Sequence, residues 1–270
     1  MSLPRMPTVL AALAVSTALT GTAALGQEAD LAKQLANPIA SLVSVPLQFN
    51  HDSGFGPDDG NKSVLNIQPV IPISLNDDWN VISRTIVPLV WQKDVAGDSG
   101  DQSGVGDITQ SFFFSPKAPG PGGLIWGVGP VFLLPTASDD RLGSGKWGIG
   151  PTAVVLKQSH GWTVGALANH IWSVAGDEDR EDISSTFLQP FLAYTTPDAW
   201  TFTLDTESTY DWKSEQWSVP INMMASKVMK LGKQPVSFQV GARYWADSPE
   251  GGPDGWGFRA VFTLLYPKKG

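Results

Sequence analysis

The feature that most constrains this chain is an alternation of apolar and polar residues that recurs along most of the sequence. Its cleanest example is WTFTLDTESTYDW at residues 200–212, where one face carries Trp, Phe, Leu and Tyr and the other carries Thr, Asp and Glu. Strict alternation over this length predicts a β-strand with two different faces. About twelve segments share the pattern: residues 43–50, 65–73, 79–91, 107–115, 124–134, 147–156, 162–174, 186–195, 200–212, 217–227, 236–246 and 256–266.

The length of these segments is informative as well. Most have roughly 9 to 13 residues, whereas an ordinary globular strand has ~5–6. A strand that crosses a bilayer at a tilt needs ~9–11 residues. Alternation alone does not choose between a soluble sandwich and a membrane barrel, because both need one apolar and one polar face on each strand.

The connections between the segments favour the membrane barrel. The first, third, fifth, seventh and eleventh connections are long, and most even-numbered ones are tight turns. The six odd-numbered connections hold seventeen Asp or Glu against six Lys or Arg, while lysines gather in the even-numbered turns and at the C-terminus. Long outer loops and short periplasmic turns are typical of outer-membrane barrels.

Tryptophan gives the same indication. Nine of the eleven Trp residues lie at or near a predicted strand end, where a membrane barrel carries its aromatic girdles: Trp79, Trp91, Trp147, Trp162, Trp172, Trp200, Trp212, Trp217 and Trp256. The sequence therefore predicts an all-β chain, a transmembrane antiparallel up-and-down β-barrel of about 12 strands with a short N-terminal helical segment.

The first 26 residues have the order of a secretory signal peptide. Arg5 precedes an apolar run at residues 9–25, and the small residues of Ala24-Leu25-Gly26 precede the polar Gln27. This order directs export. We therefore predict a signal peptide at residues 1–26, an N-terminal periplasmic or plug segment at 27–42 and an outer-membrane β-barrel at 43–270. A short helix is expected at residues 31–42, interrupted near Pro38.

These parts imply a location and partners. We expect the chain in the bacterial outer membrane, in contact with membrane lipid and lipopolysaccharide. The last strand ends on apolar and aromatic residues up to Tyr266, which resembles the terminal signal that the barrel-assembly machinery recognises.

The composition argues against several other functions. The chain has no cysteine, so thiol catalysis and thiolate metal sites are excluded. Its net charge of −8 argues against nucleic-acid binding. The acidic runs at residues 52–59 and 177–182 lack the spacing of a calcium loop and indicate a solvated acidic rim of the barrel. We therefore expect no metal site and no cofactor.

Histidine raises the question of a barrel hydrolase. His51 and His160 fall in connections, and His170 shares its parity with Trp172, so it should face lipid. A nucleophile and its base must lie within hydrogen-bond reach, and we expect no such hydroxyl beside His170. The sequence therefore predicts that the protein is not an enzyme.

Several runs resemble a bacterial family of outer-membrane barrel transporters that is grouped with MetA-pathway phenol-degradation proteins. The runs are QPVIP at 68–72, ISRTI at 82–86, GD at 106–107, FSPK at 114–117, GVGP at 127–130, LPT at 134–136, KWGIGP at 146–151, NHIW at 169–172 and YW at 244–245. The resemblance spans nearly the whole chain after residue 26. It implies a barrel and the passage of small organic solutes, and it carries no active-site motif.

Few charged residues fall on the predicted inward face: Arg84, Asp107, Asp205, Glu207, Asp211, Arg243 and Arg259. If the last hairpin pairs Ala246 with Trp256, Arg243 lies directly opposite Arg259. Adjacent like charges are destabilising, so an anionic partner such as Asp205 or Glu207 should lie nearby. Two interpretations stay open, a salt-bridge network that fills a narrow lumen and a pore lining that sets selectivity.

These features favour a passive channel or transport protein for small solutes. About twelve strands is a width at which side chains or the N-terminal segment can largely fill the lumen. A structural or interaction barrel with a closed lumen, acting through its acidic extracellular loops, is therefore the alternative. An outer-membrane lipid-modifying enzyme is the third hypothesis.

Overall fold

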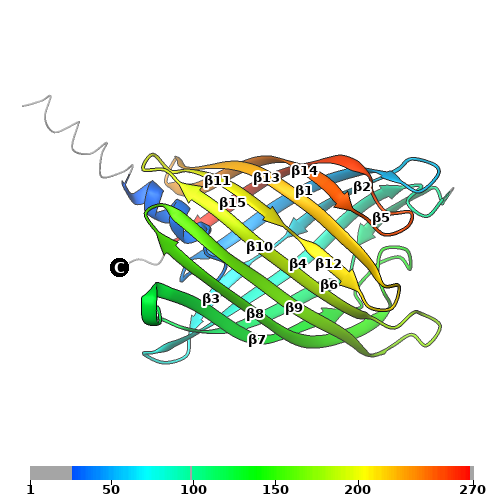
Figure 1. Cartoon of the computed structure of the whole chain (residues 1–270), viewed down its shortest axis with the longest axis horizontal. Helices are drawn as coiled ribbons and strands as arrows, with labels where there is room; N and C mark the ends of the chain where they lie inside the picture. Colours follow the sequence, from blue (N-terminus) through cyan, green and yellow to red (C-terminus); the bar gives the residue numbers. More distant parts are fainter. Residues whose placement is uncertain (1–25, 98, 268–270) are drawn as a thin grey trace, which may run out of the picture.

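The structure, a computed structural model, describes residues 26–97 and 99–267. The predicted signal peptide lies outside the described residues except for Gly26. Fifteen strand segments form one antiparallel sheet, and the pairing of β9 (Trp162–Gly176) with β10 (Ser184–Thr195) closes it into a barrel (Figure 1). The prediction of a twelve-stranded antiparallel barrel is confirmed.

Three spanning strands are each interrupted once, which is why fifteen segments make twelve spanning strands. β2 (Gly60–Ile67) and β3 (Val70–Ser74) keep one register against β4 (Trp79–Lys93), and β5 (Asp101–Val105) and β6 (Ile108–Pro116) follow each other along it. β11 (Trp200–Thr206) and β12 (Ser208–Asp211) keep one register against β13 (Gln216–Leu231). Their interruption at Glu207 lies opposite Pro220, which has no N–H to donate to the ladder.

The other spanning strands are uninterrupted: β1 (Val43–Phe55), β7 (Leu124–Leu134), β8 (Lys146–Ser159), β14 (Gln234–Asp247) and β15 (Gly255–Tyr266), with one 3-10 turn, η1 (Pro121–Gly123), before β7. β1 pairs with β15 from Val43↔Tyr266 to His51↔Phe258, so the first and last strands are neighbours.

The two ends of the barrel differ (Figure 1). At one, the turn end, the connections are residues 75–78, 117–123, 160–161, 196–199 and 232–233, and residues 26 and 267 lie there too. At the other, the loop end, β1 and β2 reach further than predicted. Residues 51–55 and 60–62, predicted as loop, continue the ladder with pairs such as Asp52↔Lys62.

The outer face of the barrel is apolar. Phe202 and Leu204 of β11 are 53% and 48% exposed, while Thr201 and Asp205 of the same strand are buried. Soluble monomers rarely expose apolar patches larger than a few hundred Å², whereas a transmembrane barrel faces lipid with them. This polarity decides between the two folds that alternation allowed.

Aromatic residues mark both ends of the apolar wall. Trp79 packs edge-on against Trp126 at the turn end, with ring centroids 5.8 Å apart, and Tyr244 packs on Trp256 at the loop end at 5.0 Å. The two belts thus follow the predicted strand ends.

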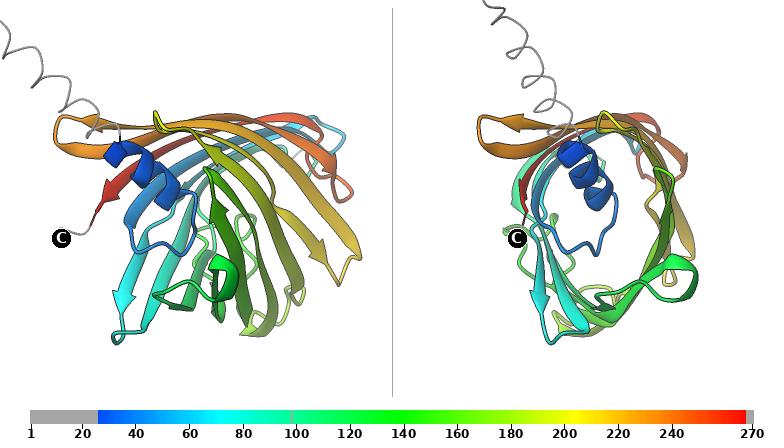
Figure 2. Two further views of the ribbon diagram at one scale, coloured as in Figure 1. Left: turned by 60° about the vertical axis from the view of Figure 1, so that its left-hand side comes forward. Right: turned by 90° about the vertical axis from the view of Figure 1, so that its left-hand side faces the viewer.

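The N-terminal segment lies inside the barrel outline at the turn end (Figure 2). Residues 26–35 are helical, and Leu31, Ala32 and Leu42 are buried in a cluster with wall residues. The helix begins earlier than predicted and ends at residue 35, because Asn37 Oδ1 accepts a hydrogen bond from the Ile39 N–H at 3.0 Å in a turn that Pro38 cannot continue as helix. Within the described residues, no helix is long and apolar enough to cross a membrane.

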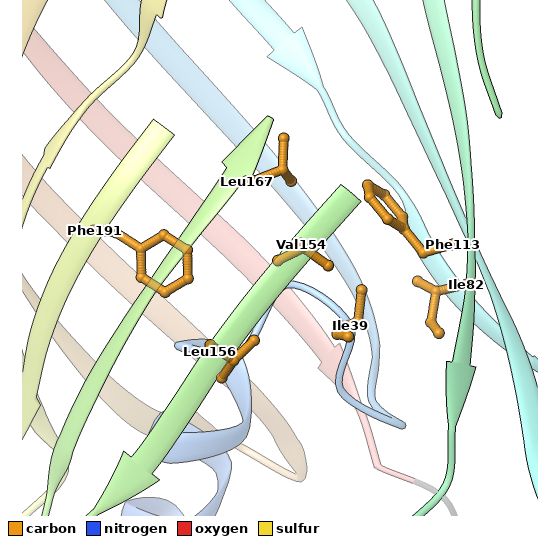
Figure 3. Close-up of a cluster of buried hydrophobic side chains, with 7 residues drawn as sticks. All are labelled: Ile39, Ile82, Phe113, Val154, Leu156, Leu167 and Phe191. Carbon is orange, nitrogen blue, oxygen red and sulfur yellow. The ribbon is translucent and has the colours of Figure 1, made fainter. Parts of the chain in front are cut away.

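The coil after this helix inserts Ile39 into an apolar part of the inner wall (Figure 3). The side chains around it are all buried and come from β4, β6, β8, β9 and β10: Ile82, Phe113, Val154, Leu156, Leu167 and Phe191. A Cβ at Gly127 would lie 3.3 Å from Ile39 Cδ1, so this inward glycine leaves room for the isoleucine. The inner wall is therefore not polar throughout, because it is apolar where Ile39 packs against it.

Candidate functional site

The rest of the inner wall carries a group of charged side chains that we call the charged belt: Asp52 of β1, Arg84 of β4, Asp205 of β11, Glu207 between β11 and β12, Arg243 of β14 and Arg259 of β15. Each lies at a position of the alternating pattern whose side chains point into the barrel. The lumen contains these charges because the barrel brings strands together that are far apart in the sequence.

Arg259 and Glu207 form the strongest contact of the belt. Arg259 is only 2% exposed, and its Nη1 and Nη2 donate to the two Glu207 carboxylate oxygens at 3.0 and 2.5 Å. Its Nε donates to Asn50 Oδ1 at 2.7 Å. Two parallel hydrogen bonds between a guanidinium and a carboxylate fix the relative orientation of the two side chains. This pair links strands that are three places apart in the wall.

Asp205 is held by amides. Asn222, which has no exposed surface, donates to Asp205 Oδ1 at 2.7 Å, and Gln189 Nε2 donates to Oδ2 at 3.4 Å. Of the two carboxylates expected near the arginines, Glu207 thus forms an ion pair with Arg259, whereas Asp205 is bound by amides.

Arg243 does not face Arg259 directly, which corrects the predicted register. The last hairpin pairs Arg243 with Gly257 and Gly241 with Arg259, a shift of two residues that keeps both side chains inside. A Cβ at Gly257 would lie 2.4 Å from Asp52 Oδ1, so the glycine leaves space for this carboxylate. Asp52 Oδ1 lies 3.7 Å from Arg243 Nε and accepts from Trp245 Nε1 at 2.9 Å.

Arg84 differs from the other two arginines. Its Nη2 donates to Gln68 Oε1 at 3.0 Å, and none of the ion pairs among the described residues includes it. Gln68 lies at the interruption between β2 and β3 and is buried.

Two predicted lining residues lie elsewhere. Asp107 sits near the loop end, where its Oδ2 accepts from the N–H and the hydroxyl of Ser144, both at 2.6 Å. Asp211 ends β12, and its Oδ1 accepts from the N–H of Lys213 at 2.8 Å within the hairpin turn. Both carboxylates shape loops rather than join the belt.

Sequence reasoning missed Asp52, because the acidic run around it was assigned to a loop. The signal was present: Gln48, Asn50 and Asp52 continue the alternation of β1 without a break. Gln68, Gln189 and Asn222 were missed because neutral amides carry no charge signal, and only the pairing of strands shows which of them meet.

A cavity of about 220 Å³ lies between the N-terminal segment and the charged belt. Leu35 and Pro38 line it from the segment, and Arg84, Asp205, Glu207 and Arg259 line it from the belt. A second cavity of about 180 Å³ shares Leu35, Pro38, Gln68, Arg84 and Gln189 with the first. Arg84 therefore lies where the two spaces meet.

His170, on the outer side of β9, has hydroxyl partners that were not expected. Its Nδ1 lies 2.7 Å from Thr186 Oγ1 and its Nε2 lies 3.5 Å from Ser184 Oγ. β10 begins at Ser184, and its register places Thr186 opposite His170. The prediction that no hydroxyl lies beside His170 is therefore wrong, although the serine contact is longer than the ~2.6–3.2 Å of an activated nucleophile.

Metal ligands do not cluster in the part of the chain that the structure describes: no three or more His, Asp or Glu side chains are placed to hold an ion.

Comparison with known proteins bears on the fold. No family model matches the chain, and no curated protein matches it either. Among solved structures, the COG4313 outer membrane channel from Pseudomonas putida F1 matches with a TM-score of 0.66 and 16% identity, over 84% of this chain and 96% of that chain. This likeness supports the barrel fold.

Other matching barrels are more distant. The translocator domain of autotransporter NalP from Neisseria meningitidis matches with a TM-score of 0.49 and 11% identity, over 94% of this chain and 99% of that one. The KdgM porin, solved with disordered oligogalacturonate, matches with a TM-score of 0.44 and 13% identity, over 84% and 100%.

Proposed function

We propose that the protein is a passive outer-membrane channel for small solutes that works without a cofactor. The observation that carries the proposal is the internal cavity of about 220 Å³ between the charged belt and the N-terminal segment. A barrel whose only task was structural would have little use for an arginine, Arg84, that lines an internal space without a carboxylate partner among the described residues. The fold shared with a structure described as an outer membrane channel supports the same conclusion.

We further propose that residues 27–42 act as a plug and that the turn end faces the periplasm. The plug is held by contacts to the wall: Gln158 Nε2 donates to the Lys33 carbonyl at 2.8 Å, and Asn80 Nδ2 donates to Ser41 Oγ at 3.1 Å. Short turns belong to the periplasmic side in bacterial barrels. A cleaved signal peptide at residues 1–26 would deliver the segment to that side.

The solute class follows from the resemblance and the lining together. The lining mixes apolar side chains such as Phe191, Met224 and Val261 with glutamines and arginine, which suits small organic compounds. Membership of the transporter family grouped with MetA-pathway phenol-degradation proteins remains part of this proposal. So do contacts with lipopolysaccharide and recognition of the last strand, β15, by the barrel-assembly machinery.

Single-channel recording tests the channel. We expect brief, discrete current steps from the refolded protein in a planar bilayer. The double variant Arg243→Ala/Arg259→Ala removes two positive charges from the belt and leaves its carboxylates in place, so the ion preference should move toward cations. A silent bilayer with inserted, heat-modifiable protein would rule out the open channel and leave the alternative, a structural or interaction barrel that acts through its acidic loops.

Lipid hydrolysis is the other hypothesis that the structure lets us test, because Ser184 and Thr186 lie beside His170. We expect no release of fatty acid from phospholipid vesicles, since the Ser184 Oγ to His170 Nε2 distance is 3.5 Å and Thr186 already binds both His170 and the Trp212 indole. Thin-layer chromatography of the lipids would detect hydrolysis. Activity that disappears in both Ser184→Ala and His170→Ala would make the protein an enzyme.

A further inference from the structure

We propose that the cavity beside Arg84 binds a small organic acid, whose carboxylate is held by the Arg84 guanidinium while its apolar body lies against the plug and the inner wall. The inference rests on the proposed channel function and specifies its substrate class.

The first step is the state of the three arginines. Arg259 is neutralised by Glu207 through two hydrogen bonds, and Arg243 lies 3.7 Å from the Asp52 carboxylate. Arg84 has only the neutral Gln68 amide oxygen as a hydrogen-bond partner among the described residues. It is the one belt arginine within that part of the chain without a carboxylate in ion-pair contact.

The second step is the state of the carboxylates that share the cavity. Both oxygens of Glu207 accept from Arg259, and both oxygens of Asp205 accept from amides of Asn222 and Gln189. Neither forms an ion pair with Arg84 among the described residues. A charged group that has left bulk water is costly unless it is paired, so an anion that enters the cavity gains most at Arg84.

The third step is donor geometry. A guanidinium has five N–H donors in a planar fork, and the Gln68 contact uses Nη2. This contact leaves the other N–H groups of the guanidinium for a ligand. A carboxylate matches the fork with two parallel hydrogen bonds, whereas an alcohol or an amide offers a single acceptor atom.

The fourth step is the shape and lining of the space. The two cavities that meet at Arg84 measure about 220 and 180 Å³, each below the ~300–1,000 Å³ of pockets for drug-sized ligands. Apolar groups face the rest of the space from both sides, among them Leu35 and Pro38 of the plug and Phe191 and Met224 of the wall. A single ring or short chain with one carboxylate fits this lining in size and polarity.

Isothermal titration of the detergent-refolded protein tests the site without requiring transport. The probes are benzoate and its neutral counterpart benzamide. We expect benzoate to bind the unsubstituted protein and benzamide to bind at least about tenfold more weakly, because a hydrogen bond to a charged group contributes more than a neutral one. Arg84→Gln should weaken benzoate binding about tenfold. Arg84→Lys keeps the charge but not the planar guanidinium, so its affinity for benzoate should lie between those of the unsubstituted protein and Arg84→Gln.

Matched controls locate the effect. Arg141→Gln makes the same change at an arginine outside the lumen, where Nη1 donates to the Ser99 carbonyl, and benzoate binding should not change. If Arg84→Gln loses heat-modifiable migration, Gln68→Leu removes the group that orients Arg84 and should weaken benzoate binding several-fold. Absent benzoate binding, or equal binding by the unsubstituted protein and by both Arg84→Gln and Gln68→Leu, would overturn the site.

The result is separable from the channel proposal. Swelling of proteoliposomes in a neutral sugar reports passage through the barrel independently of Arg84. Benzoate binding without swelling would support the binding site and contradict the channel. Swelling without benzoate binding would support the channel and contradict the binding site.

Discussion

Deletion of residues 27–42 should raise the single-channel conductance several-fold and convert brief openings into long ones. The segment occupies the turn end of the lumen, where Leu31 and Ala32 are each 3% exposed and Ile39 is 5% exposed. Their removal replaces an apolar plug with water, and the narrowest part of the path then becomes the charged belt. Planar bilayer recording of the shortened and complete chains in the same lipid measures the difference.

A reversible cross-link provides the control for the plug. Ser41 Oγ and Asn80 Nδ2 are 3.1 Å apart, and the chain has no native cysteine, so Ser41→Cys/Asn80→Cys offers a single thiol pair. The oxidised form should stay closed, and reduction should restore the brief openings. Equal conductance with and without residues 27–42 would contradict the plug.

Breaking the Arg259–Glu207 pair should cost the barrel about 3 kcal/mol of unfolding free energy, because removal of one partner leaves the other charge buried and unpaired. Arg259 is 2% exposed and the Glu207 side chain 20% exposed, so water can only partly replace the lost partner. Arg259→Met and Glu207→Leu should each show the full effect. The double variant should recover most of it, since no charge is then left alone.

Urea unfolding in lipid vesicles, followed by tryptophan fluorescence, measures these changes. Asp198→Asn is the matched control, because Asp198 lies 4.0 Å from Lys227 with side chains that are 60% and 22% exposed, and a largely exposed pair contributes little. If the double variant is as unstable as the two single changes combined, the pair acts through packing and not through charge.

The fold was predictable because its signals are local. Alternation sets which side chains face lipid, as at Phe202 and Leu204, and aromatic residues mark where strands leave the membrane. Both depend on a few neighbouring residues. The interruption at Pro69, which has no N–H to donate, and the one at Glu207, which lies opposite Pro220, were not predicted, because a proline can interrupt the hydrogen-bond ladder without breaking the alternation of side chains.

The site was predictable only in part. The alternation of apolar and polar residues correctly predicted that five charged side chains point inward: Arg84, Asp205, Glu207, Arg243 and Arg259. Their partners depend on register across hairpins, and the two-residue shift at Gly257 replaced a predicted clash between arginines with an Asp52 contact. The apolar cluster of the inner wall was not predicted, because Ile39, around which it packs, belongs to a segment with no strand pattern.

The pairing of β1 with β15 places constraints on how the protein is assembled. Val43 and Tyr266 are partners although they lie at opposite ends of the folded chain, so the seam between them has the largest loop-closure cost and depends on both termini being in place. The plug is joined directly to β1. The pairing that closes the barrel therefore also fixes the point of the wall from which residues 27–42 enter the lumen.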